Sequence, residues 1–238
     1  MSHVDTSAAC RVTDLEALFL TLKEQCPELE LVKQKTYRTW VDDHGGLVGD
    51  YPLPWLYQLK MISLVIKKYG EAKTRQMAKD VGVELPANLR DIEKNPMDLK
   101  QQRQLLSNPD FKDAYEHMAQ KVVGKDAEYA IRYKPEQGKK SAYEIGLVKN
   151  PLNQDEFLMM CDFYANGNGL LRAKGMGEHK REGSKDTWGA ELKHGYAVNA
   201  AERKIQAQIK AGHPEYGSYK KVKLNDGRVV LEVTPRNP

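Results

Sequence analysis

The spacing of apolar residues changes near residue 128, and this change constrains the fold more than any other feature of the chain. Before it, apolar side chains such as Leu59, Ile62 and Ile66 recur every three or four positions, which is the period of a helix. From Glu128 onward the period becomes two, which is the period of a strand. Because helical and strand patterns occupy separate stretches, the sequence predicts an α+β fold with an antiparallel sheet.

The helical stretch contains clear start and stop signals. Gly70 is expected to end the first helix, with Lys67 and Lys68 in its last turn, and Pro109 is well placed in the first turn of the last one. The segments predicted to be helical are 54–70, 71–82, 98–106 and 109–122. A faint helix-turn-helix character at 71–82 lacks a clear recognition helix after it.

The N-terminal segment predicts a strand, a helix and a second strand. Val4 to Val12 reads as a strand or an extended arm, and Thr13 to Glu16 has the spacing of a capping box in which Thr13 would be the N-cap. Residues 29–41 alternate like a strand, with Tyr37 on one face and Trp40 on the other.

The C-terminal half predicts a three-strand meander over residues 128–164, a helix over 196–211 and a final hairpin over 219–233. In the hairpin, Val222 is expected to point inward and Lys221 outward. Leu224, Val229, Leu231 and Val233 are expected inward with Val222, and Lys223 outward with Lys221.

A long basic segment, at about residues 165–195, interrupts this regular half. Connections of this length are uncommon in compact domains, and they are usually functional or disordered. Seven glycines loosen the backbone, and a tryptophan, Trp188, stands among cations. Cations neutralise phosphates and an indole can stack on a base, so the segment has what a single-stranded nucleic acid requires. A solvated insertion without a ligand is the other interpretation.

Composition excludes several classes of protein. The chain has 238 residues, of which 40% are hydrophobic and 29% charged, as in globular proteins. Apolar runs are too short for a membrane span, the first residues lack the pattern of a secretory signal, and three scattered cysteines fit a reducing compartment. We therefore expect a cytoplasmic protein, in the host cytoplasm if a phage encodes it. Its net charge is +4, and the basic excess lies in residues 131–238.

Motifs for catalysis or cofactor binding are absent from the sequence. There is no P-loop, dinucleotide fingerprint or zinc-protease motif, and no nucleophile, base and orienting group stand at a recognisable spacing. Asp42, Asp43 and His44 could contribute to a metal site, but no further ligands follow at useful spacing. We expect a protein that is not an enzyme and that holds neither metal nor cofactor.

Several short motifs are shared with a known family: Met1-Ser2-His3, Thr13 to Leu18, Tyr143 to Gly146, Asp162 to Tyr164, Tyr196-Ala197 and the Asn225-Asp226-Gly227 turn. In these motifs the chain resembles a plastid and cyanobacterial family of unknown function whose members begin Met-Ser-His. The resemblance implies a single sheet in the order of elements βαβ…ββαββ, with two packing helices. Against that layout, residues 42–125 would be a helical insertion within one domain covering 1–238.

The size, the mixed layout and the absence of catalytic motifs also resemble the Drc family, the single-stranded-DNA-binding RNA polymerase cofactors of podoviruses with a giant virion RNA polymerase. This resemblance implies a transcription cofactor that coats unwound DNA cooperatively, as a homo-oligomer, and recruits a phage RNA polymerase. No site residue is carried over from it.

The sequence thus leads to two functional hypotheses. In the first, the protein binds single-stranded DNA, with cations along the phosphates and aromatic rings on the bases. The candidate residues are Arg132, Tyr133, Lys134, Lys139, Lys140, Arg172, Lys174, Lys180, Arg181, Lys185 and Trp188. Trp40 is a further stacking candidate, and strand packing is the alternative role for Trp40 and Tyr133. In the second hypothesis the helical region 54–122 is an oligomerisation or partner surface, and the basic loop is incidental.

Overall fold

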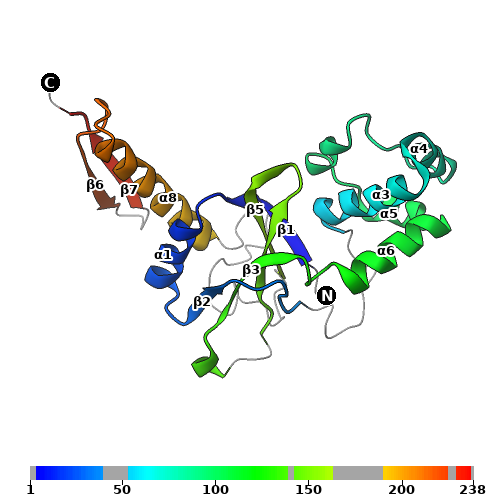
Figure 1. Ribbon diagram of the computed structural model, residues 1–238, viewed down its shortest axis with the longest axis horizontal. Coiled ribbons are helices and arrows are strands. Elements are labelled where there is room, and N and C mark those ends of the chain that lie inside the picture. The colour runs from blue at the N-terminus through cyan, green and yellow to red at the C-terminus, as the bar shows by residue number, and fades with distance from the viewer. Residues whose placement is uncertain (1–3, 40–52, 139–141, 163–189, 225–228, 237–238) are drawn as a thin grey trace.

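The computed structural model describes residues 4–39, 53–138, 142–162, 190–224 and 229–236. Helix and strand both contribute, with an antiparallel sheet at the centre and helices around it, so the α+β prediction is confirmed (Figure 1). No helix in the described ranges has both the length and the apolar character to cross a membrane.

The central sheet has five antiparallel strands. Their order is β1 (Val4–Val12), β5 (Asn153–Asp162), β4 (Ile145–Asn150), β3 (Ala127–Tyr133) and β2 (Leu29–Val32). Strands β3, β4 and β5 form the predicted meander. Strand β1 returns to pair with β5, so the first described residues lie beside the middle of the chain.

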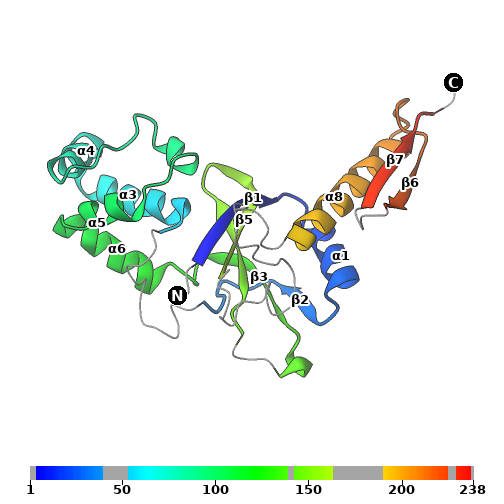
Figure 2. The ribbon, with the colours of Figure 1, turned by 180° about the vertical axis from the view of Figure 1, so that it is seen from behind.

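Each face of the sheet supports a separate hydrophobic cluster, because neighbouring strand residues point to opposite faces. Leu147 and Met159 pack on the face covered by α1 (Leu15–Gln25) and the start of α8 (Ala190–Lys210). Val148 belongs to the other cluster. The helices of the region between β2 and β3 cover that second face (Figures 1 and 2).

The helices between β2 and β3 lie where their sequence signals place them. They are α3 (Trp55–Tyr69), α4 (Glu71–Asp80), the 3₁₀ segment η1 (Leu89–Glu93), α5 (Leu99–Leu105) and α6 (Pro109–Lys121). Since β2 and β3 are neighbours in the sheet, this whole region leaves and rejoins the sheet between adjacent strands.

Local chemistry explains these boundaries. Gly70 ends α3 with φ +82°, a conformation that glycine adopts without steric cost, and Pro109 opens α6 where its missing amide is harmless. The fully buried Gln58 donates to the carbonyls of Leu53 and Met97 and accepts from the Met97 amide. This satisfied amide joins the start of α3 to the chain before α5.

Two N-terminal predictions need correction. The N-cap of α1 is Asp14, whose carboxylate accepts from the Ala17 amide at 3.0 Å, so the predicted capping box on Thr13 is wrong. The second strand ends at Val32, although Tyr37 and Thr39 are buried on one side as the alternation predicted. Their backbone continues as irregular extended chain, with the Tyr37 amide donating to the Gly124 carbonyl at 2.9 Å.

The final hairpin forms a second sheet of its own, which differs from the single sheet that the family resemblance implied. It consists of β6 (Ser218–Lys223) and β7 (Val229–Thr234), and it lies along α8, with contacts from His194 to Gln206, away from the central sheet (Figure 1). We call residues 201–236 the C-terminal arm. None of its described residues is buried.

The predicted orientation of the hairpin is wrong for β6, whereas Val229, Leu231 and Val233 of β7 lie on the face toward α8, as predicted. The Lys221 ammonium contacts Asn199 and Glu202 of α8, at 3.2 and 3.3 Å, so this lysine faces the helix. Its partner across the ladder is Leu231, and Val222 pairs with Val230 on the face turned away from α8. On β6 the inward face is polar because Tyr219 and Lys221 contact acidic and amide groups of α8, and on β7 it is apolar.

Candidate nucleic-acid interface

One end of the central sheet gathers the starting points of the two basic connections predicted from sequence. Met160, Gly146 and Ala130 form one row across β5, β4 and β3, and both Asp162 and Tyr133 lie beyond this row on the same side. Strands are about 4.8 Å apart, so the end of β5 and the end of β3 are separated by roughly 10 Å. The chain therefore leaves the sheet toward residues 134–144 and toward residues 163–189 at the same end of the sheet, from strands that are separated only by β4.

Arg132, the first candidate residue, already has partners. Its Nε donates to Glu30 Oε1 at 2.8 Å, and its Nη1 donates to Gln34 Oε1 at 3.2 Å. The ion pair is half-exposed and ties β3 to β2. Because Glu30 neutralises this guanidinium locally, Arg132 would have to exchange a carboxylate for a phosphate to join a binding groove.

Tyr133, the second candidate, belongs to the core. Its side chain is 9% exposed and lies in the cluster below α1 and α8, and burial raises its pKa. A ring in this position offers no open face to a base, which fits the strand-packing role that the sequence also allowed. Lys134 follows at the start of the short η2 turn (Pro135–Gln137), where its side chain is half-exposed and its amide donates to the Glu28 carbonyl.

The remaining candidates lie outside the described residues. They are Lys139, Lys140, Arg172, Lys174, Lys180, Arg181, Lys185 and Trp188, together with Trp40, Asp42, Asp43 and His44. The structure thus gives the positions of the described residues on either side of these segments. The roles of the candidate residues within them stay predictions.

The end of the predicted basic loop has a different structure from the one expected. Helix α8 begins at Ala190, so residues 190–195 are helical. A Cβ on Gly195 would lie 2.2 Å from Gln25 Nε2 and 2.8 Å from Thr21 Cγ2, which means that this glycine allows α8 to approach α1 closely. Sequence reasoning assigned Gly195 to loop flexibility because the contacting residues lie far away in the chain.

Polar contacts hold α8 on α1 around this glycine. The Tyr196 hydroxyl accepts from the Thr13 and Asp14 amides, at 2.8 and 3.2 Å, and Arg203 Nε donates to the Asp14 carboxylate at 2.7 Å. Partial burial by itself would raise the pKa of Asp14, but the Arg203 guanidinium and the Ala17 amide outweigh it and lower that pKa below its ordinary value.

The C-terminal arm adds exposed cations to this basic half. Lys204 and Lys210 on α8 and Lys220 and Lys223 on β6 are exposed, and they form no ion pair with another described residue. Lys221, in contrast, is held by Glu202 at 3.3 Å and lies 3.9 Å from Glu24. The arm therefore presents uncompensated positive charge away from the sheet end.

A second polar cluster lies between the sheet and α3. The Tyr37 and Tyr57 hydroxyls are 3.0 Å apart, Tyr57 donates to Asp126 at 3.2 Å, and Lys60 forms an ion pair with Asp126. Burial, with the nearby Tyr37 and Asp126, raises the pKa of Tyr57 well above its ordinary value, so its hydroxyl stays neutral. A neutral buried hydroxyl pair of this kind suits anchoring of the helical region on the sheet better than proton transfer.

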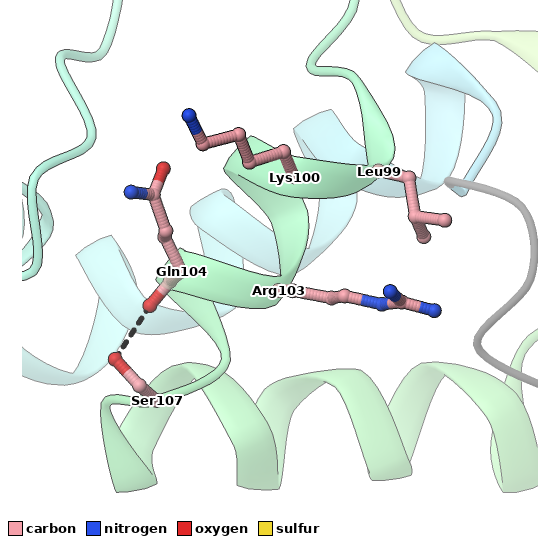
Figure 3. Close-up of a pocket in the computed structure, with 5 residues that line it drawn as sticks. All are labelled: Leu99, Lys100, Arg103, Gln104 and Ser107. Carbon is pink, nitrogen blue, oxygen red and sulfur yellow. Dashed lines mark hydrogen bonds between the residues drawn. The ribbon is translucent and has the colours of Figure 1, made fainter.

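An open hollow of about 580 Å³ on the helical region is the candidate pocket that sequence reasoning did not single out. Its lining residues come from α5 and the turn after it: Leu99, Lys100, Arg103, Gln104 and Ser107 (Figure 3). Lys100 and Gln104 point to one side of α5, and Arg103 points to the other. The Ser107 hydroxyl donates to the Gln104 carbonyl at 2.6 Å. With this hydroxyl engaged and no acid among the lining residues, the hollow does not assemble a base beside a nucleophile.

The described residues bring together no group of three or more histidine, cysteine or acidic side chains suited to a metal ion. Comparison with known proteins gave no match: no family model, no curated protein and no solved structure matches this chain.

Proposed function

We propose that the protein binds single-stranded nucleic acid without acting on it as an enzyme. The observation that supports this proposal is the common origin of the two basic connections at one end of the central sheet, beside the ends of β3 and β5. Five cations and Trp188 lie in the longer connection, and Lys139 and Lys140 lie in the shorter one. Cations in two connections that start from the same end of the sheet can follow one strand of phosphates between them.

The physical basis is the release of counterions. Each phosphate that a lysine or arginine neutralises frees condensed ions, and on single strands the slope of log affinity against log salt is about −0.7 per phosphate. Stacking of bases on Trp188 would add roughly 1–3 kcal/mol per base. By the resemblance described above, the bound strand would be unwound DNA offered to a phage RNA polymerase.

The test is a fluorescence anisotropy titration with labelled single-stranded DNA, the matching duplex and single-stranded RNA, at low and high salt. We expect tight, salt-dependent binding of the single strand in preference to the duplex. A triple substitution of Lys180, Arg181 and Lys185 by Ala is expected to weaken it about tenfold or more.

A matched control removes the same charge elsewhere. The helical region has three exposed lysines, Lys79, Lys94 and Lys112. Their joint substitution by Ala changes only the long-range electrostatic field of the protein, so the affinity is expected to stay within about twofold. Equal losses in both triple variants would show that net charge alone is responsible. Absence of binding to any strand at low salt would refute the proposal.

A further inference from the structure

The first turns of α8 lie at the same end of the central sheet as the starts of the two basic connections. Gly195 lies against Gln25, the last residue of α1. The chain turns after Gln25 and enters β2 at Leu29, which pairs with Tyr133 at the end of β3. Leu192 is buried in the same cluster as Tyr133. Because the longer connection joins β5 to α8, it both begins and ends at this end of the sheet.

The hairpin of the C-terminal arm reaches back toward this point with its turn end. The Val229 amide, at the start of β7, donates to His194 Nε2 of α8 at 3.2 Å. Across the ladder, Val229 pairs with Lys223, the last residue of β6. Among the described cations of the arm, Lys223 therefore lies nearest to the start of α8, whereas Lys204 and Lys210 lie further along that helix.

Two lysines of β6 differ in how their charge is compensated. Side chains two positions apart lie on one face of a strand, so Lys223 shares the face of Lys221. Glu202 contacts the Lys221 ammonium at 3.3 Å, and Glu24 lies 3.9 Å from it. Lys223 is exposed, and no described acidic residue forms an ion pair with it. The described residues thus leave the charge of Lys223 available to an anion.

We propose that Lys223 contacts a phosphate of the bound single strand, so that the strand runs from the sheet end past the start of α8 to the turn end of the hairpin. The inference rests on the proposed function, because it extends the same binding site. His194 is the positioning residue, since its bond with Val229 holds this end of the hairpin on α8 and places Lys223 toward the end of the longer basic connection.

A nucleic-acid strand is the ligand that suits this arrangement. The cations that would contact it stand on three separate elements, which are the shorter connection, the longer connection and β6. A small anion could bind at only one of these elements, whereas phosphates repeat along a strand and each can be neutralised in turn. A contact to phosphate carries no sequence information, so we expect the contribution of Lys223 to be the same for every base composition.

The first test is a charge reversal at Lys223 with a matched reversal at Lys204. Both side chains are exposed, and Lys204 lies about 15 Å further along the helix axis than His194. In a titration of the full chain with labelled oligo-dT, Lys223→Glu is expected to weaken binding about fivefold to tenfold. The slope of log affinity against log salt is expected to become shallower by about 0.7. Lys204→Glu is expected to stay within about twofold of wild type.

The role of His194 is tested by a double-mutant cycle on the same affinity. His194→Ala removes the acceptor of the Val229 amide, so Lys223 is no longer held near the strand. The loss caused by Lys223→Glu is therefore expected to be smaller in the His194→Ala background than in wild type. Additive losses would overturn the positioning role, because they would show that Lys223 acts without this bond.

A footprint on the wild-type protein gives a readout that needs no substitution. Lysine acetylation followed by mass spectrometry is expected to show Lys223 protected by bound oligo-dT and Lys204 equally reactive with and without it. Circular dichroism verifies that the variants are folded. Equal losses in the two reversal variants, or unchanged acetylation of Lys223 in the complex, would overturn the inference while the proposed function stands. A wild-type chain that binds no strand at low salt would overturn both.

Discussion

The body of the molecule and its C-terminal arm are held together by different forces. In the body, both faces of the central sheet bury apolar side chains, and residues such as Leu18 and Phe111 have no exposed surface. In the arm, no described residue is buried, and the hairpin is fixed to α8 through Tyr219 and Lys221. The comparison indicates that packing fixes the body, whereas exchangeable polar contacts position the arm.

Removing matched side chains from both regions is expected to give the largest difference in stability between body and arm. Leu18→Ala is expected to lower the free energy of unfolding by about 2–5 kcal/mol, because it leaves a cavity in a fully buried site. Ile209→Ala in the arm, where the side chain is half-exposed, is expected to cost about 1 kcal/mol or less. Urea denaturation measures both, and similar losses would contradict the contrast.

A second prediction tests how tightly the body is packed. A Cβ on Gly146 would lie 2.4 Å from the ring of Tyr37, so Gly146→Ala is expected to destabilise the protein by roughly 2 kcal/mol. The cost should shrink in a Tyr37→Leu background, where the ring is absent. A double-mutant cycle measured by urea unfolding checks this. If the two losses in the free energy of unfolding are additive, the Tyr37 ring moves aside without cost.

The third prediction concerns the junction between body and arm. At an exposed helix position, replacing glycine by alanine stabilises by about 1 kcal/mol. Gly195→Ala is expected to do the opposite, destabilising by about 1 kcal/mol, because the new methyl group would meet Thr21 and Gln25. Thermal unfolding gives the sign directly. Gln25→Ala is expected to recover part of the loss, and a stabilised variant would mean that α8 simply shifts.

A smaller effect is expected within the arm itself. Lys221→Met removes the contacts with Asn199 and Glu202, and since the lysine is about a third exposed, the loss is expected to be about 0.5–1 kcal/mol. Amide exchange should then become faster in β6 while the central sheet is unaffected. Faster exchange throughout the protein would show that the arm is not an independent unit.

The smallest effect is a change in titration. Because the pKa of Asp14 is lowered in the folded chain, its contribution to stability is complete above its unfolded value of about 3.9 and is lost as the pH falls through the folded value. Arg203→Gln is expected to raise the pKa of Asp14 and reduce this acid dependence. NMR titration of the carboxyl carbon follows it, and an unchanged pKa would assign the shift to the Ala17 amide instead.

Local signals in the sequence were sufficient for most of the secondary structure. Gly70 and Pro109 mark helix boundaries through backbone constraints that do not depend on the rest of the fold, and the alternation around Ile131 follows from the two-residue period of a strand, whose large apolar residues lie on one face. Asp14, rather than Thr13, caps α1 through the Ala17 amide, and its second partner, Arg203, comes from far along the chain, where local spacing gives no signal.

The candidate site could be predicted less well for the same reason. Arg132 and Tyr133 match a binding pattern in sequence, but Glu30 engages the first and the core under α1 takes the second. Lys221 appeared to be a solvated charge because its acidic partner lies on a helix that precedes the strand. Ile62, in the helical region 54–122 that the second hypothesis treats as an oligomer surface, is fully buried, so making it polar would disturb folding before it disturbed assembly.

The placement of the helical region between two neighbouring strands has a consequence for how the chain folds. Val32 and Ala130 pair in the sheet although the whole of α3 to α6 separates them. Helices that contact near neighbours in sequence order quickly, and once they are formed the effective loop between β2 and β3 becomes short. Strand β1 pairs with β5 across an even longer separation, so its docking is expected to come late and its amides to be the first in the central sheet to open.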